Sequence, residues 1–280
     1  MRYGNCVSYK NAGHIKILKN AGFDYIETGL TVLYTAEKQE IKEFIGALRE
    51  NNIKCEAVNV LFPGGITLTG ENAEFGKVKD YVDAVFEKTK EIGFETVVFG
   101  SGGARKCPDG FPKEKATEQI IEIIQNYLAP AAEKYNFTLA IEELNNSETN
   151  ILNKISEVEY IISKVNHPKI KLLADLYHMG LENDDINGLT EDITAHCHIA
   201  NPFNKRYYPQ KSDSDKAINL YKDFFNRLKQ INYNKKISIE GGLGGLESPE
   251  IKDIPDWVDE NDRIFYIESK KSLEFMRGLN

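Results

Sequence analysis

The chain has 280 residues, 41% of them apolar and 28% charged, which is an ordinary globular balance able to fill one large α/β core. Its formal net charge of −8 opposes contact with phosphate backbones, so we expect no nucleic-acid partner. No run approaches the ~18 apolar residues that a membrane helix needs, and the four cysteines form no C-x-x-C pair, so we expect a cytoplasmic protein with reduced thiols and no membrane partner.

Short β-rich runs alternate with longer amphipathic stretches along the whole chain. The runs that predict strands are, in order, 2–8, 23–28, 53–60, 95–100, 137–142, 169–175, 194–199 and 235–240. Between them apolar residues recur at i, i+3, i+4 and i+7, and this period predicts helices, most clearly over 36–51, 73–92, 114–135, 149–165 and 214–232. In KNAGFDYIE, RENNIKCEA and KEIGFETVV, a Gly or Asn suited to a helix C-cap stands between helix and strand.

These segments form a β/α repeat with a period of ~30–40 residues. Eight strands with intervening helices predict a (β/α)8 TIM barrel, one domain over residues 1–280, with a doubly wound open sheet as the competing arrangement. The polar, irregular stretch 246–267 precedes a final helix near 268–278. We expect that stretch to lie over one mouth of the barrel, with Trp257 in a packing role.

Metal-competent side chains stand at the ends of four successive predicted strands. Active sites of such barrels are built at the C-terminal ends of the strands, and here these ends carry Glu142, Asp175, His198 and Glu240. One carboxylate at a strand end is often a helix N-cap or a surface residue, but metal-competent side chains at four successive strand ends are hard to obtain by chance. Three carboxylates and one imidazole suit Mn²⁺, Mg²⁺ or Co²⁺, so we predict one divalent metal ion.

The alternation of side chains along a strand separates these residues from their neighbours. If Glu143 faced the lumen, Glu142 would lie in the apolar layer between strand and helices, where an unpaired carboxylate is costly. We therefore expect Glu142 to be the inward residue. Both His196 and His198 face the lumen in this register, and we expect His196 one layer below His198, in a supporting or core role.

Four phrases carry a family resemblance: IEELNNSET (141–149), ADLYHM (174–179), HCHIAN (196–201) and SIEGG (238–242). In this order and spacing the chain resembles the xylose isomerase-like TIM barrel superfamily, in particular its sugar epimerase and isomerase branch related to ketose (D-tagatose/D-psicose) 3-epimerases. The likeness covers nearly the whole chain. It implies that Glu142 and Glu240 bind the metal, Mn²⁺ in the first place, and also act as the acid–base pair, with Asp175 and His198 completing the coordination.

The resemblance also implies the reaction. A ketose would be epimerised at C3 through an enediolate that the metal stabilises, with one base on each face of the carbon. Glu148 and His178 match family positions that contact the substrate's oxygens, and Arg206 is the nearby arginine expected to bind the substrate. The expected partner is a small-molecule sugar or sugar phosphate. The sequence does not decide the oligomeric state, and a homo-oligomer is compatible with it.

The chain departs from the ketose epimerases at two places. Where they show Pro and then Leu-Asn-Arg after the strand-5 glutamate, this chain has ELNN at 143–146. Where they place a Glu after the His-x-His strand, it has Asn201, and Arg206 aligns with the family's arginine only after a shift. These departures bear on the substrate more than on the metal or the reaction type.

Two glycine-rich loops, 100–105 (GSGGAR) and 241–245 (GGLGG), match neither a P-loop nor a dinucleotide fingerprint. We interpret them as flexible turns. Because barrels often bind phosphate after their last strands, a phosphorylated sugar is an alternative, with Arg105 as the candidate partner of the phosphate.

Other functions occur on the same barrel. An aldose–ketose isomerase of the hydroxypyruvate isomerase type would move a proton between adjacent carbons, and an inosose dehydratase-like lyase is a further alternative. An abasic-site endonuclease needs a three-zinc cluster, hence more histidine ligands than the five histidines here readily supply. A non-catalytic sugar sensor would be expected to lose one of the paired glutamates, and both are present.

Overall fold

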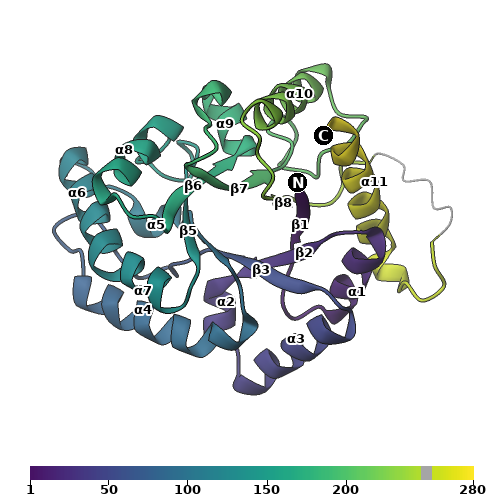
Figure 1. Ribbon diagram of the computed structural model, residues 1–280, viewed down its shortest axis with the longest axis horizontal. Coiled ribbons are helices and arrows are strands. Elements are labelled where there is room, and N and C mark those ends of the chain that lie inside the picture. The colour runs from purple at the N-terminus through teal and green to yellow at the C-terminus, as the bar shows by residue number, and fades with distance from the viewer. Residues whose placement is uncertain (247–253) are drawn as a thin grey trace.

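Eight parallel strands close into a barrel in chain order, with β1 paired to both β2 and β8 (Figure 1). The computed structural model describes residues 1–246 and 254–280. The strands are β1 (Arg2–Cys6), β2 (Tyr25–Gly29), β3 (Lys54–Asn59), β4 (Thr96–Phe99), β5 (Thr138–Glu142), β6 (Ile170–Asp175), β7 (Thr194–Ile199) and β8 (Lys236–Ile239). The predicted (β/α)8 barrel is confirmed, and the open doubly wound sheet is excluded.

The helices form an outer ring around the strands (Figure 1). The α-helices are α1 (Ala12–Ala21), α2 (Leu30–Thr35), α3 (Lys38–Glu50), α4 (Phe75–Thr89), α5 (Gly102–Arg105), α6 (Lys113–Ile123), α7 (Ala129–Lys134), α8 (Ile155–Val165), α9 (Leu176–Glu182), α10 (Asp215–Gln230) and α11 (Arg263–Leu279). Short 3-10 turns are η1 (Lys90–Ile92), η3 (Ile186–Gly188) and η4 (Glu260–Asp262), and η2 (Ile124–Leu128) is π-helical. The last helix, α11, packs beside α1 and so completes the ring.

Two predicted helices differ from the structure for local reasons. The predicted helix 114–135 is interrupted by η2 between α6 and α7. Pro130 follows this turn and has no N–H to donate to the preceding turn, which is a usual cause of such irregularities. The predicted helix 149–165 begins only with α8, because Leu152 has a φ of 57°, which a right-handed helix does not contain.

The C-terminal segment lies elsewhere than predicted. Helix α11 begins at Arg263, before the predicted start near 268. Residues 247–253 of the irregular stretch lie outside the described residues. Residues 254–262 lie on the outside of the barrel beside α1 and α11, not over its mouth (Figure 1). Trp257 has the predicted packing role although it is 39% exposed. Its ring lies 6.4 Å from that of Tyr266 of α11, and Lys16 Nζ of α1 lies 4.3 Å from its centre.

Two layers of buried apolar side chains show which strand positions face the lumen. The larger layer lies between strands and helices, and a small inner layer consists of Val98, Ala140 and Leu173. Ala140 and Leu173 each stand two residues before a strand end. The side chains of Glu142 and Asp175 therefore face the lumen just above this inner layer, as the alternation predicts.

A bulge changes the alternation in β3. In its pairing with β2, this strand carries one extra residue, Glu56. As a result Cys55 and Val58, three positions apart, both pack in the outer layer, and Asn59 faces the lumen, where its Nδ2 donates to Glu240 Oε1 at 2.9 Å. Bulges commonly re-aim a side chain beside an active site in this way.

Gly4 of β1 lies directly against the ring of Tyr25. A Cβ at Gly4 would overlap ring atoms of Tyr25, and this ring is fully buried and unable to move without displacing its neighbours. We expect Gly4→Ala to lower the free energy of unfolding by about 1–3 kcal/mol, measured by urea denaturation. The control is Gly46→Ala in α3, where a Cβ meets no atom within 4 Å and where alanine should stabilise the helix by up to ~1 kcal/mol. Equal stability of Gly4→Ala and the unchanged protein would contradict the close packing.

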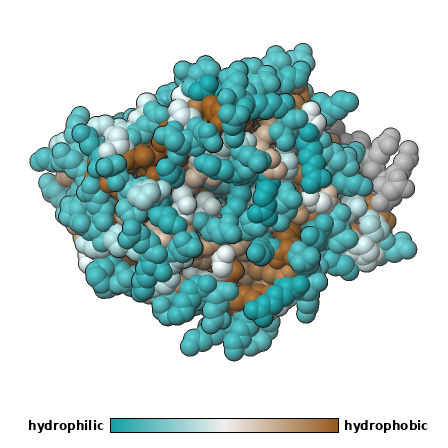
Figure 2. All heavy atoms as spheres, in the orientation of Figure 1, coloured by the Kyte–Doolittle hydropathy of each residue, from teal (hydrophilic) through white to brown (hydrophobic). Residues whose placement is uncertain are grey.

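The face of the molecule shown in Figure 2 is mostly hydrophilic, with small apolar areas between the outer helices. Most of the large apolar side chains lie beneath it in the core. Among the described residues, the helices are all too short or too polar to cross a membrane.

Candidate active site

Four side chains from successive strands meet at the C-terminal mouth of the barrel. Glu142 ends β5, Asp175 ends β6, His198 lies near the end of β7, and Glu240 directly follows β8. Each side chain offers one ligand atom, and these atoms all lie within 4.8 Å of one another. The structure thus brings together the four residues that the sequence analysis selected as metal ligands.

Polar atoms in this cluster lack partners. Glu142 Oε1, His178 Nε2 and His198 Nδ1 are buried and form no hydrogen bond with the described residues. His198 Nδ1 lies 3.0 Å from Glu240 Oε2 and 3.4 Å from Glu142 Oε1. Because an unpaired buried polar atom costs about 1–3 kcal/mol, several at one place indicate a binding site. Carboxylate oxygens and one imidazole nitrogen are a donor set that fits a divalent cation.

The two glutamates of the cluster lie in different electrostatic surroundings. Arg206 Nη2 lies 2.9 Å from Asp175 Oδ2 and 2.5 Å from Glu240 Oε2. Burial raises the pKa of Glu142. Burial also acts to raise the pKa of Glu240, but attraction from His198 and Arg206 outweighs it and lowers this pKa to about 2. The two glutamates of the cluster therefore differ in how readily they take up a proton.

His178 presents an N–H to the same space. The backbone N–H of Asn145 donates to His178 Nδ1 at 3.2 Å. Because Nδ1 accepts this bond, the proton of the neutral ring is on Nε2. Nε2 lies 3.4 Å from Asp175 Oδ2 and 3.8 Å from Glu142 Oε1. The sequence analysis missed this role of Asn145, which only the folded loop reveals.

The loop after β7 brings Arg206 into the site, although Arg206 aligns with the arginine of the ketose epimerases only after a shift. The carbonyl of Arg206 accepts the N–H of Gly242 at 2.9 Å, and a Cβ at Gly241 would lie only 2.5 Å from this oxygen. Asn201 is buried at the start of the loop, and its carboxamide oxygen accepts a loop backbone N–H at 2.9 Å. Arg206 Nη1 then lies 3.6 Å from Glu148 Oε1, so both predicted substrate contacts stand at the mouth of the cluster.

The interpretation of Arg105 as a phosphate partner is wrong. Arg105 is fully buried; its Nη1 donates to the carbonyl of Phe99 at 3.0 Å and its Nη2 to that of Glu142 at 2.7 Å. Burial lowers the pKa of Arg105 to about 10. Its guanidinium thus joins the ends of β4 and β5.

Turn flexibility also does not explain Gly100, because a Cβ there would overlap the carboxylate of Glu142.

Glu143 lies outside the cluster. Its Oε1 accepts the backbone N–H of Asp175 at 2.8 Å, and burial raises the pKa of Glu143 well above its usual value. Glu142 is therefore the carboxylate that faces the cluster, and Glu143 supports the end of β6.

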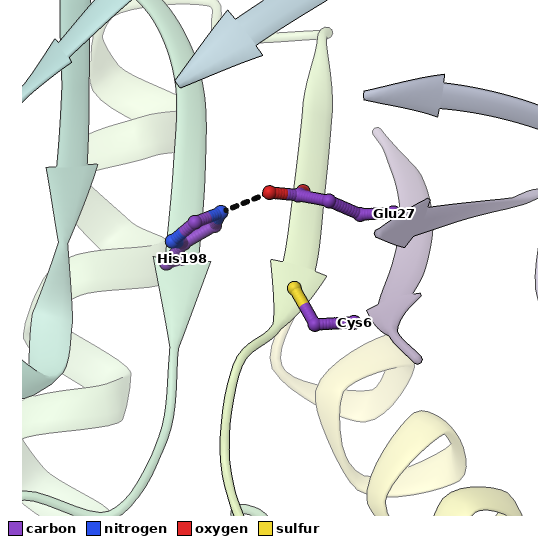
Figure 3. Close-up of side chains that lie close together, drawn as sticks. All are labelled: Cys6, Glu27 and His198. Carbon is purple, nitrogen blue, oxygen red and sulfur yellow. Dashed lines mark hydrogen bonds and ion pairs between the residues drawn. The ribbon is translucent and has the colours of Figure 1, made fainter. Parts of the chain in front are cut away.

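Glu27 of β2 is a buried residue at this site that the sequence analysis missed. Its carboxylate lies between two imidazoles, 2.8 Å from His196 Nε2 and 2.9 Å from His198 Nε2. Figure 3 shows the contact with His198. His196 lies one layer below His198, as predicted, and is fully buried. Side-chain alternation along the second strand places Glu27, two residues after the inward Tyr25, on the same inner face as Glu142, and this was the signal in the sequence.

Comparisons with known proteins give the family of this chain and agree with its fold. The model of the family described as xylose isomerase-like TIM barrel matches residues 15–261. The chain is 24% identical over 278 residues to the L-ribulose 3-epimerase of Methylomonas sp. (strain DH-1), covering 92% of this chain and 87% of that protein. It is 22% identical over 236 residues to the 3-dehydro-D-guloside 4-epimerase of Escherichia coli (strain K12), covering 81% of this chain and 86% of that protein. The solved D-psicose 3-epimerase with D-tagatose from Clostridium cellulolyticum H10 shares the fold with a TM-score of 0.79 at 20% identity, covering 100% and 99% of the two chains.

Proposed function

Because this chain belongs to the xylose isomerase-like TIM barrel family, we propose that it is a metal-dependent sugar isomerase that epimerises a ketose at C3. The observation that carries the proposal is the pair Glu142 and Glu240, which reach one cluster from strands on different sides of it. The names of two relatives support this chemistry, since each places the inverted carbon next to a carbonyl: C3 beside a C2 ketone, or C4 beside a 3-keto group.

Glu142, Asp175, His198 and Glu240 would hold the ion, Mn²⁺ in the first place with Mg²⁺ or Co²⁺ as alternatives. Bound there, the ion supplies Lewis acidity that polarises a substrate carbonyl and makes the neighbouring C–H more acidic. The two glutamates then divide the proton transfer between them. One carboxylate removes the proton from one face of C3, and the carboxylic acid of the other returns a proton to the opposite face.

The neighbouring side chains would orient the sugar. His178, whose Nδ1 accepts from Asn145, offers its Nε2–H to a substrate oxygen. Arg206 and Glu148 stand together at the mouth and provide donors and acceptors for hydroxyl groups. A small-molecule sugar or sugar phosphate is thus the proposed partner. Arg105 is too deeply buried to bind a phosphate group.

A screen of free and phosphorylated ketoses with added Mn²⁺ in D₂O tests this function, with ²H followed at C3 and C1 by NMR. We expect ²H at C3 together with formation of the C3 epimer. Exchange at C1 with aldose formation would instead show an aldose–ketose isomerase. The same screen without added metal, on chelated protein, is the control. An absence of metal-dependent exchange with every ketose would contradict the proposal.

A further inference from the structure

Glu27 is fully buried in β2, directly beside the candidate metal cluster but outside it. We propose that Glu27 is a positioning residue. It accepts a hydrogen bond from His198 Nε2–H and thereby orients His198 Nδ1 toward the metal. This inference rests on the proposed function, in which His198 is a ligand. It concerns a residue that touches neither the substrate nor the ion.

Both oxygens of Glu27 are engaged by donors. Oε1 lies 2.9 Å from His198 Nε2, and Oε2 lies 2.8 Å from His196 Nε2. Oε2 also accepts from the hydroxyl of Ser238 at 2.7 Å. Because Ser238 donates its only hydroxyl proton to Glu27, it accepts from the Tyr25 hydroxyl, which lies 2.8 Å away. Glu27 is therefore the acceptor at the end of a buried set of hydrogen bonds whose donors come from β7 and β8, with Tyr25 of β2 one step further away.

The bond between Glu27 and His198 decides which ring nitrogen is available for a metal. A carboxylate only accepts hydrogen bonds, so His198 Nε2 carries a proton. In the neutral ring the lone pair is then on Nδ1, the nitrogen that faces Glu240 Oε2 at 3.0 Å. A flipped ring or the other tautomer would lose the bond to Glu27. Hydrogen bonds of this kind on a metal-ligating histidine typically orient the ring and raise its basicity.

Glu27 could alternatively be a ligand itself, because Cys6, Glu27 and His198 also lie within reach of a common ion (Figure 3). The geometry of the carboxylate opposes this. The hydrogen bonds to His196, His198 and Ser238 already occupy both oxygens of Glu27. The contacts of Glu27 thus suit a hydrogen-bond acceptor better than a metal ligand.

The test is the affinity of the metal-free protein for Mn²⁺, measured by isothermal titration calorimetry. Glu27→Gln keeps the shape but removes the charge and one of the two accepting oxygens. We expect the Kd for Mn²⁺ to rise about 10–100-fold, the usual effect of losing such a partner. The matched control is Glu56→Gln, a buried glutamate of β3 whose Oε1 pairs with Arg2 at 2.6 Å, away from the cluster. Glu56→Gln should lower the free energy of unfolding and leave the Kd for Mn²⁺ unchanged.

Ser238→Ala is the second variant, because it removes one donor to Glu27 with little change in volume. We expect a smaller rise in Kd, which decides the question if Glu27→Gln does not fold. An unchanged Kd in the folded variants would overturn only the positioning role of Glu27. If the unmodified protein bound no Mn²⁺, the metal site and the proposed function would both be overturned. Two ions per chain, reduced to one by Cys6→Ser, would make Glu27 a ligand and overturn the positioning role.

Discussion

Glu240→Gln should lower kcat for epimerisation by about 10²–10⁴-fold, the usual contribution of a general acid or base. The amide cannot exchange a proton with C3, although it nearly keeps the size of the side chain. Glu240 lies beyond the last residue of β8 and is not part of the apolar core. We therefore expect a folded variant, checked by circular dichroism, whose Mn²⁺ content is measured alongside its activity.

Solvent exchange separates loss of one base from general damage to the site. If each glutamate serves one face of C3, Glu240→Gln should still exchange ²H into one epimer but not into the other. Glu142→Gln should show the opposite preference. An unchanged kcat in Glu240→Gln, or identical exchange of both epimers in the two variants, would contradict the two-base mechanism.

Removal of divalent metal with a chelator should abolish epimerisation and lower the melting temperature. Without an ion, the carboxylates of Glu142, Asp175 and Glu240 share a small space with Arg206 and His198 as the nearby positive groups. Mn²⁺ at about 100 times its Kd would add about 2.7 kcal/mol of stability. In a chain of this size, that gain corresponds to a rise in Tm of roughly 5–10 °C.

Differential scanning fluorimetry of the chelated protein, with Mn²⁺, Mg²⁺ and Co²⁺ added back in turn, measures this shift and ranks the ions. Asp175→Asn is the control. It removes one carboxylate of the cluster and should lose most of the metal-dependent shift. Full activity in protein shown to be metal-free would contradict the proposed cofactor.

The barrel and the meeting of the four cluster residues could be predicted because both follow from periodic patterns. Alternation along β5 and β6 places Glu142 and Asp175 on the inner face whatever the details of packing. Closure of the eight strands then brings the strand ends to one mouth. The single domain over residues 1–280, the cytoplasmic location and the roles of the site residues stay predictions.

The supporting residues were harder to predict, because contacts distant in sequence decide them. The bulge at Glu56 turns Asn59 toward Glu240, against the simple alternation of β3. The burial of Arg105 depends on the carbonyl ends of β4 and β5, which no local pattern encodes. The stretch 246–267 was predicted over the mouth because it is polar and irregular, yet its described residues 254–262 lie outside the barrel, where Trp257 contacts Lys16 and Tyr266.

By itself the sequence determined the eightfold β/α order and the inward register of Glu142, Asp175, His198 and Glu240, since side-chain alternation is a local property of the chain. The tertiary structure alone decided that Glu27 holds His198 and that Arg206 reaches Asp175. Each of these pairs joins residues that are distant in the sequence, and only the closed barrel and its folded loops bring them within hydrogen-bonding distance.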